Sequence, residues 1–243
     1  MLGELACGAS KVFENAADLY HEASTLHADG ALSRALFLYQ ISLEECAKIE
    51  MLGAWAVSVL TGTEVGIQKV VVAFASHKAK NYANAYSLPA TSSEADARSQ
   101  KRWDEAMKAF KQKQTDFHLQ SNSAKNASLY VDFQNGTFAA PKDRISESMV
   151  KSIAQTNKEF LASAQTKTKM MTHWLKNFDE VKNLMNGLTT LLEERITQSK
   201  DPEEAISAIM DEILTRAKQT GYYKAMTEQI RSERDTANGS IAK

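Results

Sequence analysis

A mostly apolar stretch near the start of the chain, residues 34–52 (RALFLYQISLEECAKIEML), carries Arg34, Glu44, Glu45 and Lys48. Charged groups in apolar surroundings need partners, because an unpaired buried charge costs several kcal/mol or more. The stretch therefore forms either a structural ion-pair network or the floor of a site.

The spacing of these charges is helical. At about 100° per residue, Arg34, Glu45 and Lys48 fall on one stripe, and the neighbouring acid Glu44 lies at its edge. Glu44 stands one turn before Lys48, the favourable order for an i,i+4 pair, which contributes about 0.3–0.5 kcal/mol when exposed. The apolar flanks argue against full exposure, so a helix salt bridge and a buried site both stay open.

A second polar cluster follows the apolar run 70–75. Its members lie three, four and seven residues after the first and therefore share one helix face: His77, Lys80, Asn81 and Asn84. An imidazole here can act as a general base, contact RNA, or serve as a hydrogen-bonded structural histidine.

Long helices must position these clusters, because the 243 residues include only 10 Gly and 3 Pro. Apolar periodicity and turn signals predict helices at 2–28, 32–60, 65–86, 94–120, 146–198 (with Asn186-Gly187 as a candidate break) and from 202 onward. Asn135-Gly136 predicts a hairpin turn between strands at 129–133 and 137–139, since both turn residues must accept positive φ. The predicted fold class is all-α, a mainly helical bundle with one small β-hairpin around residues 129–139. We expect one domain over 1–231 and a polar, disordered tail over 232–243.

Composition limits the partners. The net charge of −1 gives no overall attraction to nucleic acid or anionic lipid, so such binding needs a local patch. The most apolar runs, 51–60 and 70–75, are shorter than the roughly 20 residues of a membrane helix, and no secretory leader is visible. We therefore expect a soluble, cytoplasmic protein with no membrane partner. Cys7 and Cys46 lie at apolar helical positions and are expected to be buried free thiols.

Several motif classes are missing from the sequence. There is no Gly-rich phosphate loop, no Ser/His/Asp arrangement and no zinc-ligand spacing. Di-iron sites in helical bundles use Glu-x-x-His, but Ala47 and Lys48 occupy the positions three after Glu44 and Glu45. We therefore expect no cofactor and no metal.

Three blocks of the sequence follow one another from about Arg34 to Pro141. The blocks are Arg34-Ala35 with SLEECAKI at 42–49, Phe74-x-x-His77-Lys78-x-Lys80, and Leu129-Tyr130-Val131-Asp132 followed by Asn135-Gly136 and Pro141. In order and spacing they resemble the signature of the AbiV-type abortive-infection proteins.

The resemblance implies a HEPN-like helical domain from bacterial phage defence. Many HEPN proteins are metal-independent ribonucleases that act as homodimers, and AbiV-type proteins are associated with stopping translation after infection, a toxin-like role. The usual HEPN signature, Arg followed by His after four to six residues, is absent here. The nearest matches are Lys113-x4-His118 and Lys167-x5-His173. This departure leaves open whether the protein is an enzyme.

Two functions remain as hypotheses. In the first, the protein is a metal-independent endoribonuclease, with His77 as base and cations at the phosphate. The candidate catalytic residues are His77, Lys48, Glu45, Glu44 and Lys80, and the candidate substrate-binding residues are Arg34, Asn81, Tyr130 and Lys125. A phage-encoded protein is a possible activator. In the second, the protein is a non-catalytic binding module that senses or sequesters a phage or ribosomal protein.

Overall fold

The computed structural model describes residues 1–63, 66–134 and 136–198. The chain divides into two compact units, Met1–Lys176 and a second one that begins at Asn177. Within the described ranges the protein is almost entirely helical, apart from one two-stranded hairpin. The predicted fold class is confirmed.

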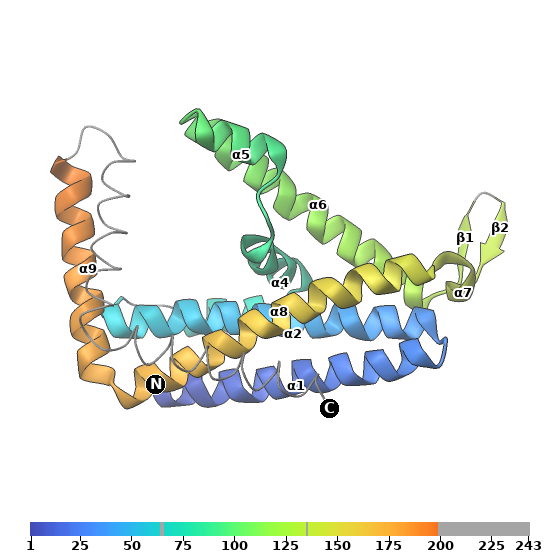
Figure 1. Ribbon diagram of the computed structural model, residues 1–243, viewed down its shortest axis with the longest axis horizontal. Helices are drawn as coiled ribbons and strands as arrows, with labels where there is room; N and C mark the ends of the chain where they lie inside the picture. Colours follow the sequence, from blue (N-terminus) through green and yellow to red (C-terminus); the bar gives the residue numbers. More distant parts are fainter. Residues whose placement is uncertain (64–65, 135, 199–243) are drawn as a thin grey trace, which may run out of the picture. The chain divides into compact units, whose positions relative to one another are not determined.

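The first unit is built on three long helices that pack along one another (Figure 1). They are α1 (Leu2–Ala28), α2 (Leu32–Thr61) and α8 (Glu147–Lys176). Gly30 joins α1 to α2 with a φ of +76°, which glycine adopts without the steric penalty of a side chain. Because this connection is short, α1 and α2 run in opposite directions.

Small and polar side chains bring the three long helices close together. Ala16 on α1 is fully buried, and its carbonyl oxygen accepts a 2.7 Å hydrogen bond from Ser42 Oγ on α2. Asn157 on α8 accepts from the same hydroxyl and donates to the carbonyl oxygen of Tyr39. Because buried polar groups must be paired, these bonds set the register of the helices.

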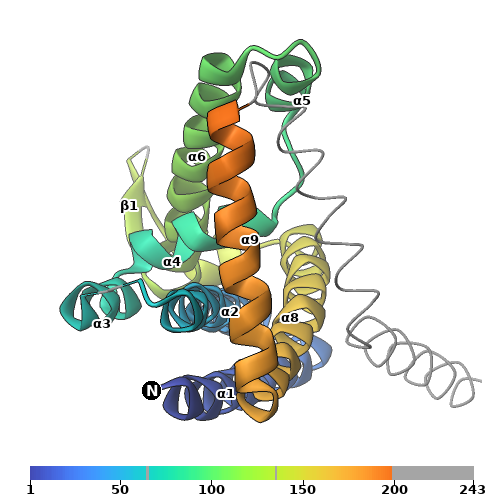
Figure 2. The ribbon, with the colours of Figure 1, turned by 90° about the vertical axis from the view of Figure 1, so that its left-hand side faces the viewer.

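A second layer crosses the long helices. The C-terminal part of helix α6 (Trp103–Leu129) packs against α2. Helix α5 (Ser92–Ser99) packs on the part of α6 that lies farther from α2. The short helix α4 (His77–Asn84) contacts both α2 and α6, as Figure 2 shows from the side. Residues from α2, α4 and α6 therefore meet around α4.

The single helix predicted at 65–86 is wrong. The chain instead forms α3 (Ile67–Ala75), then α4, then the 3-10 turn η1 (Ala85–Ser87). Ser76 separates α3 from α4 with extended backbone, and its Oγ accepts a hydrogen bond from the Ala79 amide at 3.2 Å. Serine favours this N-cap position, because its oxygen satisfies an otherwise free amide of the first turn.

The helix predicted at 94–120 is also divided. Lys101 has a φ of +57° between α5 and α6, which ends α5 and turns the chain back along α6. α6 then continues to Leu129, so the strand predicted at 129–133 is shorter, and β1 spans Asp132–Gln134.

The hairpin itself is confirmed. β1 pairs antiparallel with β2 (Thr137–Ala139), and Phe133 lies opposite Phe138. Gly136 has a φ of +80° in the turn, as the Asn-Gly motif predicted. The short helix α7 (Pro141–Arg144) follows, and Pro141 begins it, where a missing backbone N–H does no harm.

The predicted helix 146–198 is interrupted at Asn177 rather than at the candidate break near 186–187. α8 ends at Lys176, and α9 (Phe178–Gln198) belongs to the second unit. The helix predicted from 202 and the tail predicted at 232–243 lie outside the described residues. Within the described ranges, no helix has the length and apolarity to cross a membrane.

A candidate active site at a buried carboxylate

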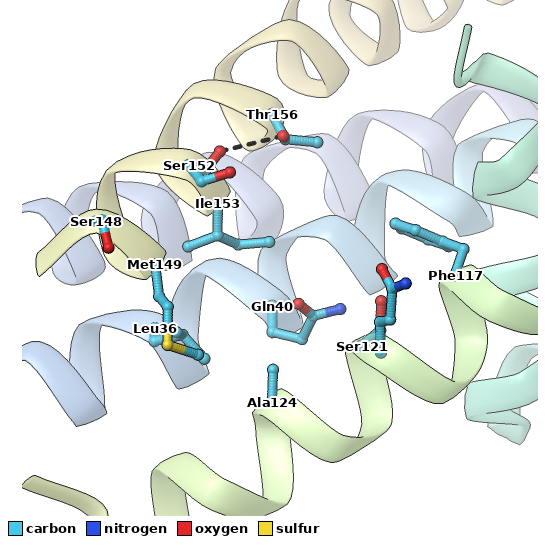
Figure 3. A pocket seen from close by; sticks show the side chains of 11 residues that line it. Leu36, Gln40, Phe117, Ser121, Ala124, Ser148, Met149, Ser152, Ile153 and Thr156 are labelled. Atoms are coloured by element: carbon cyan, nitrogen blue, oxygen red, sulfur yellow. Dashed lines mark hydrogen bonds between the residues drawn. The ribbon is translucent and has the colours of Figure 1, made fainter. Parts of the chain in front are cut away.

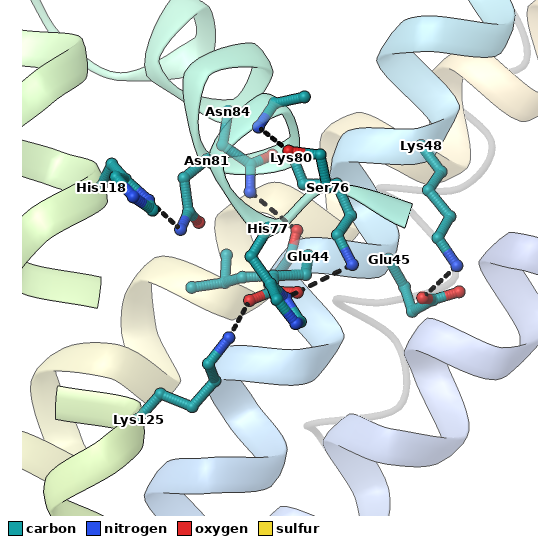
Figure 4. Close-up of polar contacts among 12 residues, drawn as sticks. Glu44, Glu45, Lys48, Ser76, His77, Lys80, Asn81, Asn84, His118 and Lys125 are labelled. Atoms are coloured by element: carbon teal, nitrogen blue, oxygen red, sulfur yellow. Dashed lines mark hydrogen bonds and ion pairs between the residues drawn. The ribbon is translucent and has the colours of Figure 1, made fainter. Parts of the chain in front are cut away.

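The carboxylate of Glu44 is the centre of the polar cluster between α2, α4 and α6. Its side chain is 1% exposed and contacts three cationic or basic groups (Figure 4). Lys125 Nζ of α6 donates to Oε1 at 2.8 Å. Lys80 Nζ of α4 lies 2.9 Å from Oε2, and His77 Nδ1 lies 2.5 Å from the same oxygen. Three elements therefore converge on one acid.

The electrostatics of the cluster favour an ionised Glu44. Burial alone would raise the pKa of this carboxyl, but hydrogen bonds from Lys125, Lys80 and His77 outweigh burial and lower the pKa. The side chains of Lys80 and Lys125 are each only 9% exposed. One carboxylate against two ammonium groups leaves the cluster net positive, a suitable environment for an anion.

His77 combines a fixed orientation with an open face. Because ionised Glu44 can only accept a hydrogen bond, the proton between them sits on His77 Nδ1. In the neutral ring the other nitrogen, Nε2, is then an acceptor, on a side chain that is 53% exposed. A carboxylate that holds the tautomer of an accessible imidazole is the arrangement that general-base histidines use.

A second histidine joins the cluster. Asn81 Nδ2 donates to His118 Nδ1 at 3.3 Å, so the neutral His118 ring carries its proton on Nε2. Burial and then the positive charges of Lys78 and Lys125 lower the pKa of His118, which keeps the ring neutral. The cluster thus holds one imidazole with a free acceptor and one with a free donor.

The sequence patterns did not select His118 for this site. Lys113, which precedes His118 at the spacing of the HEPN signature, pairs with Glu94 instead, and its Nζ lies 2.9 Å from the Glu94 carboxylate. The usable signal was the seven-residue spacing from His118 to Lys125, which places both side chains on one face of α6.

The predicted shared face of α4 is confirmed in its geometry. His77 and Lys80 reach Glu44, Asn81 reaches His118, and Asn84 Nδ2 donates to the carbonyl oxygen of Leu43 at 2.8 Å. The last bond ties α4 to the backbone of α2 beside Glu44.

The two neighbouring acids of α2 have different surroundings. Lys48 pairs with Glu45 at 2.5 Å, and not with Glu44 as the i,i+4 spacing predicted. In Figure 4 the Glu45–Lys48 pair lies to one side of the contacts around Glu44. Of the EExxK segment, only Glu44 joins the cluster with His77.

Two predicted substrate-binding residues lie away from Glu44. Arg34 is ten residues earlier on α2, about 15 Å along the helix, and its Nη1 donates to the carbonyl oxygen of Ser128. Tyr130 follows the end of α6 and is 61% exposed. Lys125, another predicted substrate-binding residue, is buried against Glu44.

The described residues contain no group of three or more His, Cys, Asp or Glu placed to hold a metal ion. The oxygens of Glu44 are already occupied by lysine and histidine donors.

The two thiols differ, contrary to the expectation that both are buried. Cys46 is buried beside the cluster, whereas Cys7 is exposed. Burial, with added repulsion from Glu45 and Glu50, raises the pKa of the Cys46 thiol to about 12. Since the thiolate is the reactive form, the two cysteines should react very differently.

Iodoacetamide at pH 8 is expected to alkylate Cys7 and to leave Cys46 unmodified in the folded protein. Peptide mass spectrometry measures this directly, and unfolding in guanidinium should make both thiols react. Equal labelling of both thiols in the native protein would contradict the burial of Cys46.

The fold and the cluster define a class, a helical protein with a carboxylate-oriented histidine among buried lysines. The family model HEPN_AbiV, described as AbiV, matches residues 4–162, a range that includes Glu44, His77, His118 and Lys125. The chain therefore belongs to the AbiV family of HEPN proteins. The predicted resemblance is confirmed.

One relative is the "Uncharacterized protein y4gJ" of Sinorhizobium fredii (strain NBRC 101917 / NGR234). It is 42% identical over 109 residues, which are 45% of this chain and 57% of the relative. The match thus spans little more than half the length of that protein. No solved structure matches the chain.

Proposed function

We propose that this protein is a metal-independent endoribonuclease of phage defence that acts in the cytoplasm, as a homodimer, to stop translation. The observation that carries the proposal is the pair formed by Glu44 and His77. It combines a buried carboxylate, a fixed tautomer and an accessible Nε2 in a net positive setting. Membership of the AbiV family supports the defence role.

The proposed reaction needs no cofactor. His77 Nε2 takes the proton of a ribose 2′-hydroxyl, and the 2′-oxygen attacks the adjacent phosphorus. The bond to the 5′-oxygen breaks, and that oxygen takes a proton from water. The products are a 2′,3′-cyclic phosphate and a 5′-hydroxyl. The positive charge of Lys80 and Lys125 stabilises the extra negative charge of the phosphorane.

Incubation of the purified protein with RNA in EDTA tests the proposal. We expect internal cleavage, with 2′,3′-cyclic phosphate ends detected by mass spectrometry, and no stimulation by Mg²⁺. The same assay should be repeated with lysate from phage-infected cells, since a phage-encoded protein is a candidate activator. Cleavage that requires a divalent metal, or ends that carry a 5′-phosphate, would reject the mechanism.

A non-catalytic binding module is the second candidate. It is favoured by the apolar surface of α3, where Val71 is 56% exposed and Val72 is 67% exposed. Exposed apolar side chains on one short helix suit contact with a phage or ribosomal protein. Absence of RNA cleavage under all conditions, together with capture of such a partner through α3, would favour this function.

A further inference from the structure

A groove lies between α2, α6 and α8 (Figure 3). Its volume is about 500 Å³, within the range of about 300–1,000 Å³ that is typical of ligand sites. Its walls include Gln40 of α2, Phe117 and Ser121 of α6, and Met149 and Ile153 of α8.

Gln40 has an unused hydrogen-bond donor in this groove. The residue is only 2% exposed, and its Nε2 has no partner. In Figure 3 the amide of Gln40 points into the space between the helices, toward Ser121 and Phe117. A buried donor without a partner destabilises the empty protein, so a ligand acceptor at this position gains a hydrogen bond at little further desolvation cost.

The lining defines the chemistry of the ligand. Among the described residues, no charged side chain lines the groove, which combines the half-buried ring of Phe117 with Met149, Ile153 and the hydroxyl of Ser152. An uncharged, flat molecule with hydrogen-bond acceptors fits such walls. Nucleobases have this form, and glutamine amides and aromatic rings recognise them by hydrogen bonding and stacking.

The position of the groove supports a base rather than an isolated small molecule. Gln40 lies one helical turn before Glu44, and Ser121 lies one turn before Lys125, so each spacing is about 6 Å along its helix. Phe117 is the direct neighbour of His118. Along α2 and along α6, the groove is therefore about one helical turn from residues of the positive cluster.

We propose that the groove binds one unpaired RNA base, with a carbonyl oxygen or ring nitrogen of the base accepting from Gln40 Nε2 and the base face against Phe117. That the bound polymer is RNA rests on the proposed function. Binding of the base does not itself require that the protein cleaves RNA.

The test compares Gln40→Leu with its parent in binding a fluorescent single-stranded RNA hexamer, by anisotropy in EDTA. Both proteins carry His77→Ala to prevent cleavage. A matched hexamer with abasic sugars is the second probe. We expect Gln40→Leu to weaken binding of the RNA about 2- to 10-fold, the usual effect of one hydrogen bond, and to leave binding of the abasic hexamer unchanged. The control Gln155→Leu, an exposed change on α8, should alter neither affinity.

Thermal unfolding excludes a structural explanation. Because Gln40→Leu removes an unpaired donor, its melting temperature should equal or exceed that of the parent. The proposal is overturned if Gln40→Leu binds the RNA as tightly as the parent, loses affinity for both probes equally, or melts much earlier. Failure of the parent to bind the RNA also overturns it. Base-dependent binding without any cleavage by the wild type would instead reject only the nuclease function.

Discussion

Replacement of Glu44 by glutamine is expected to lower the free energy of unfolding by about 3–5 kcal/mol, because it leaves two buried ammonium groups without their counter-charge. Lys80 and Lys125 both depend on this carboxylate, and each side chain is only 9% exposed. Glutamine keeps the size of the side chain, so the change isolates the charge. Urea denaturation followed by circular dichroism measures the loss.

Two matched substitutions serve as controls for Glu44→Gln. Glu105 is 61% exposed and pairs with Arg102 on the surface, so Glu105→Gln should change stability by about 0–1 kcal/mol. Glu45 has one lysine partner in place of two, so Glu45→Gln should destabilise the protein less than Glu44→Gln does. An equal loss in Glu44→Gln and Glu105→Gln would show that the buried cluster contributes no special stability.

The acid dependence of stability gives an independent check on Glu44. Its folded-state pKa lies below the ordinary value of 4.5, so the unfolded chain binds the proton more readily. The stabilisation is therefore complete above pH 4.5 and is lost as the pH falls through the lowered pKa. The stability difference between wild type and Glu44→Gln should shrink below pH 4.5. The pKa values of Glu94 and Glu147 are also lowered, so these acids contribute to the acid dependence of stability as well. Their contributions are the same in wild type and in Glu44→Gln and cancel in the difference.

Removal of the imidazole in His77→Ala is expected to slow RNA cleavage by about 10²–10⁴-fold, the usual contribution of a positioned general base. Glu44 keeps both lysine partners in this variant, so the fold should persist. Single-turnover cleavage of a defined RNA measures the rate, and circular dichroism verifies the fold.

His21→Ala is the control for the histidine substitution, because His21 lies exposed on α1. It should cleave RNA at the wild-type rate. Wild-type cleavage by His77→Ala would remove His77 from the mechanism. An equal loss in both variants would point to contamination or to a general effect on the protein.

The sequence predicted the type of the elements well but not their limits. Periodicity indicated helical structure in 65–86 and 94–120, but the prediction of one unbroken helix in each range was wrong, because each contains a break. At Ser76 the break depends on one side-chain cap, and at Lys101 it depends on a single positive φ. Such local events do not alter the apolar period of the flanking residues, so the pattern alone does not reveal them.

The candidate site was predicted in part. The shared face of His77 and Lys80 followed from helical spacing, and the structure places both side chains on one carboxylate. Helical spacing did not show whether Glu44 or Glu45 is the acid that His77 and Lys80 contact. The two acids point in directions about 100° apart around the helix. Only the packing of α4 and α6 on α2 determines which acid is enclosed.

The sequence by itself determined the helical class of this protein, the polar face of α4, the Asn-Gly hairpin and membership of the AbiV family, since each depends on neighbouring residues or on the order of short blocks along the chain. The tertiary structure alone decided which residues form the cluster. Lys125 reaches Glu44 from 81 positions along the chain, and Asn81 meets His118 across 37. Contacts at such separations depend on how helices cross, a property of side-chain packing that no local spacing specifies.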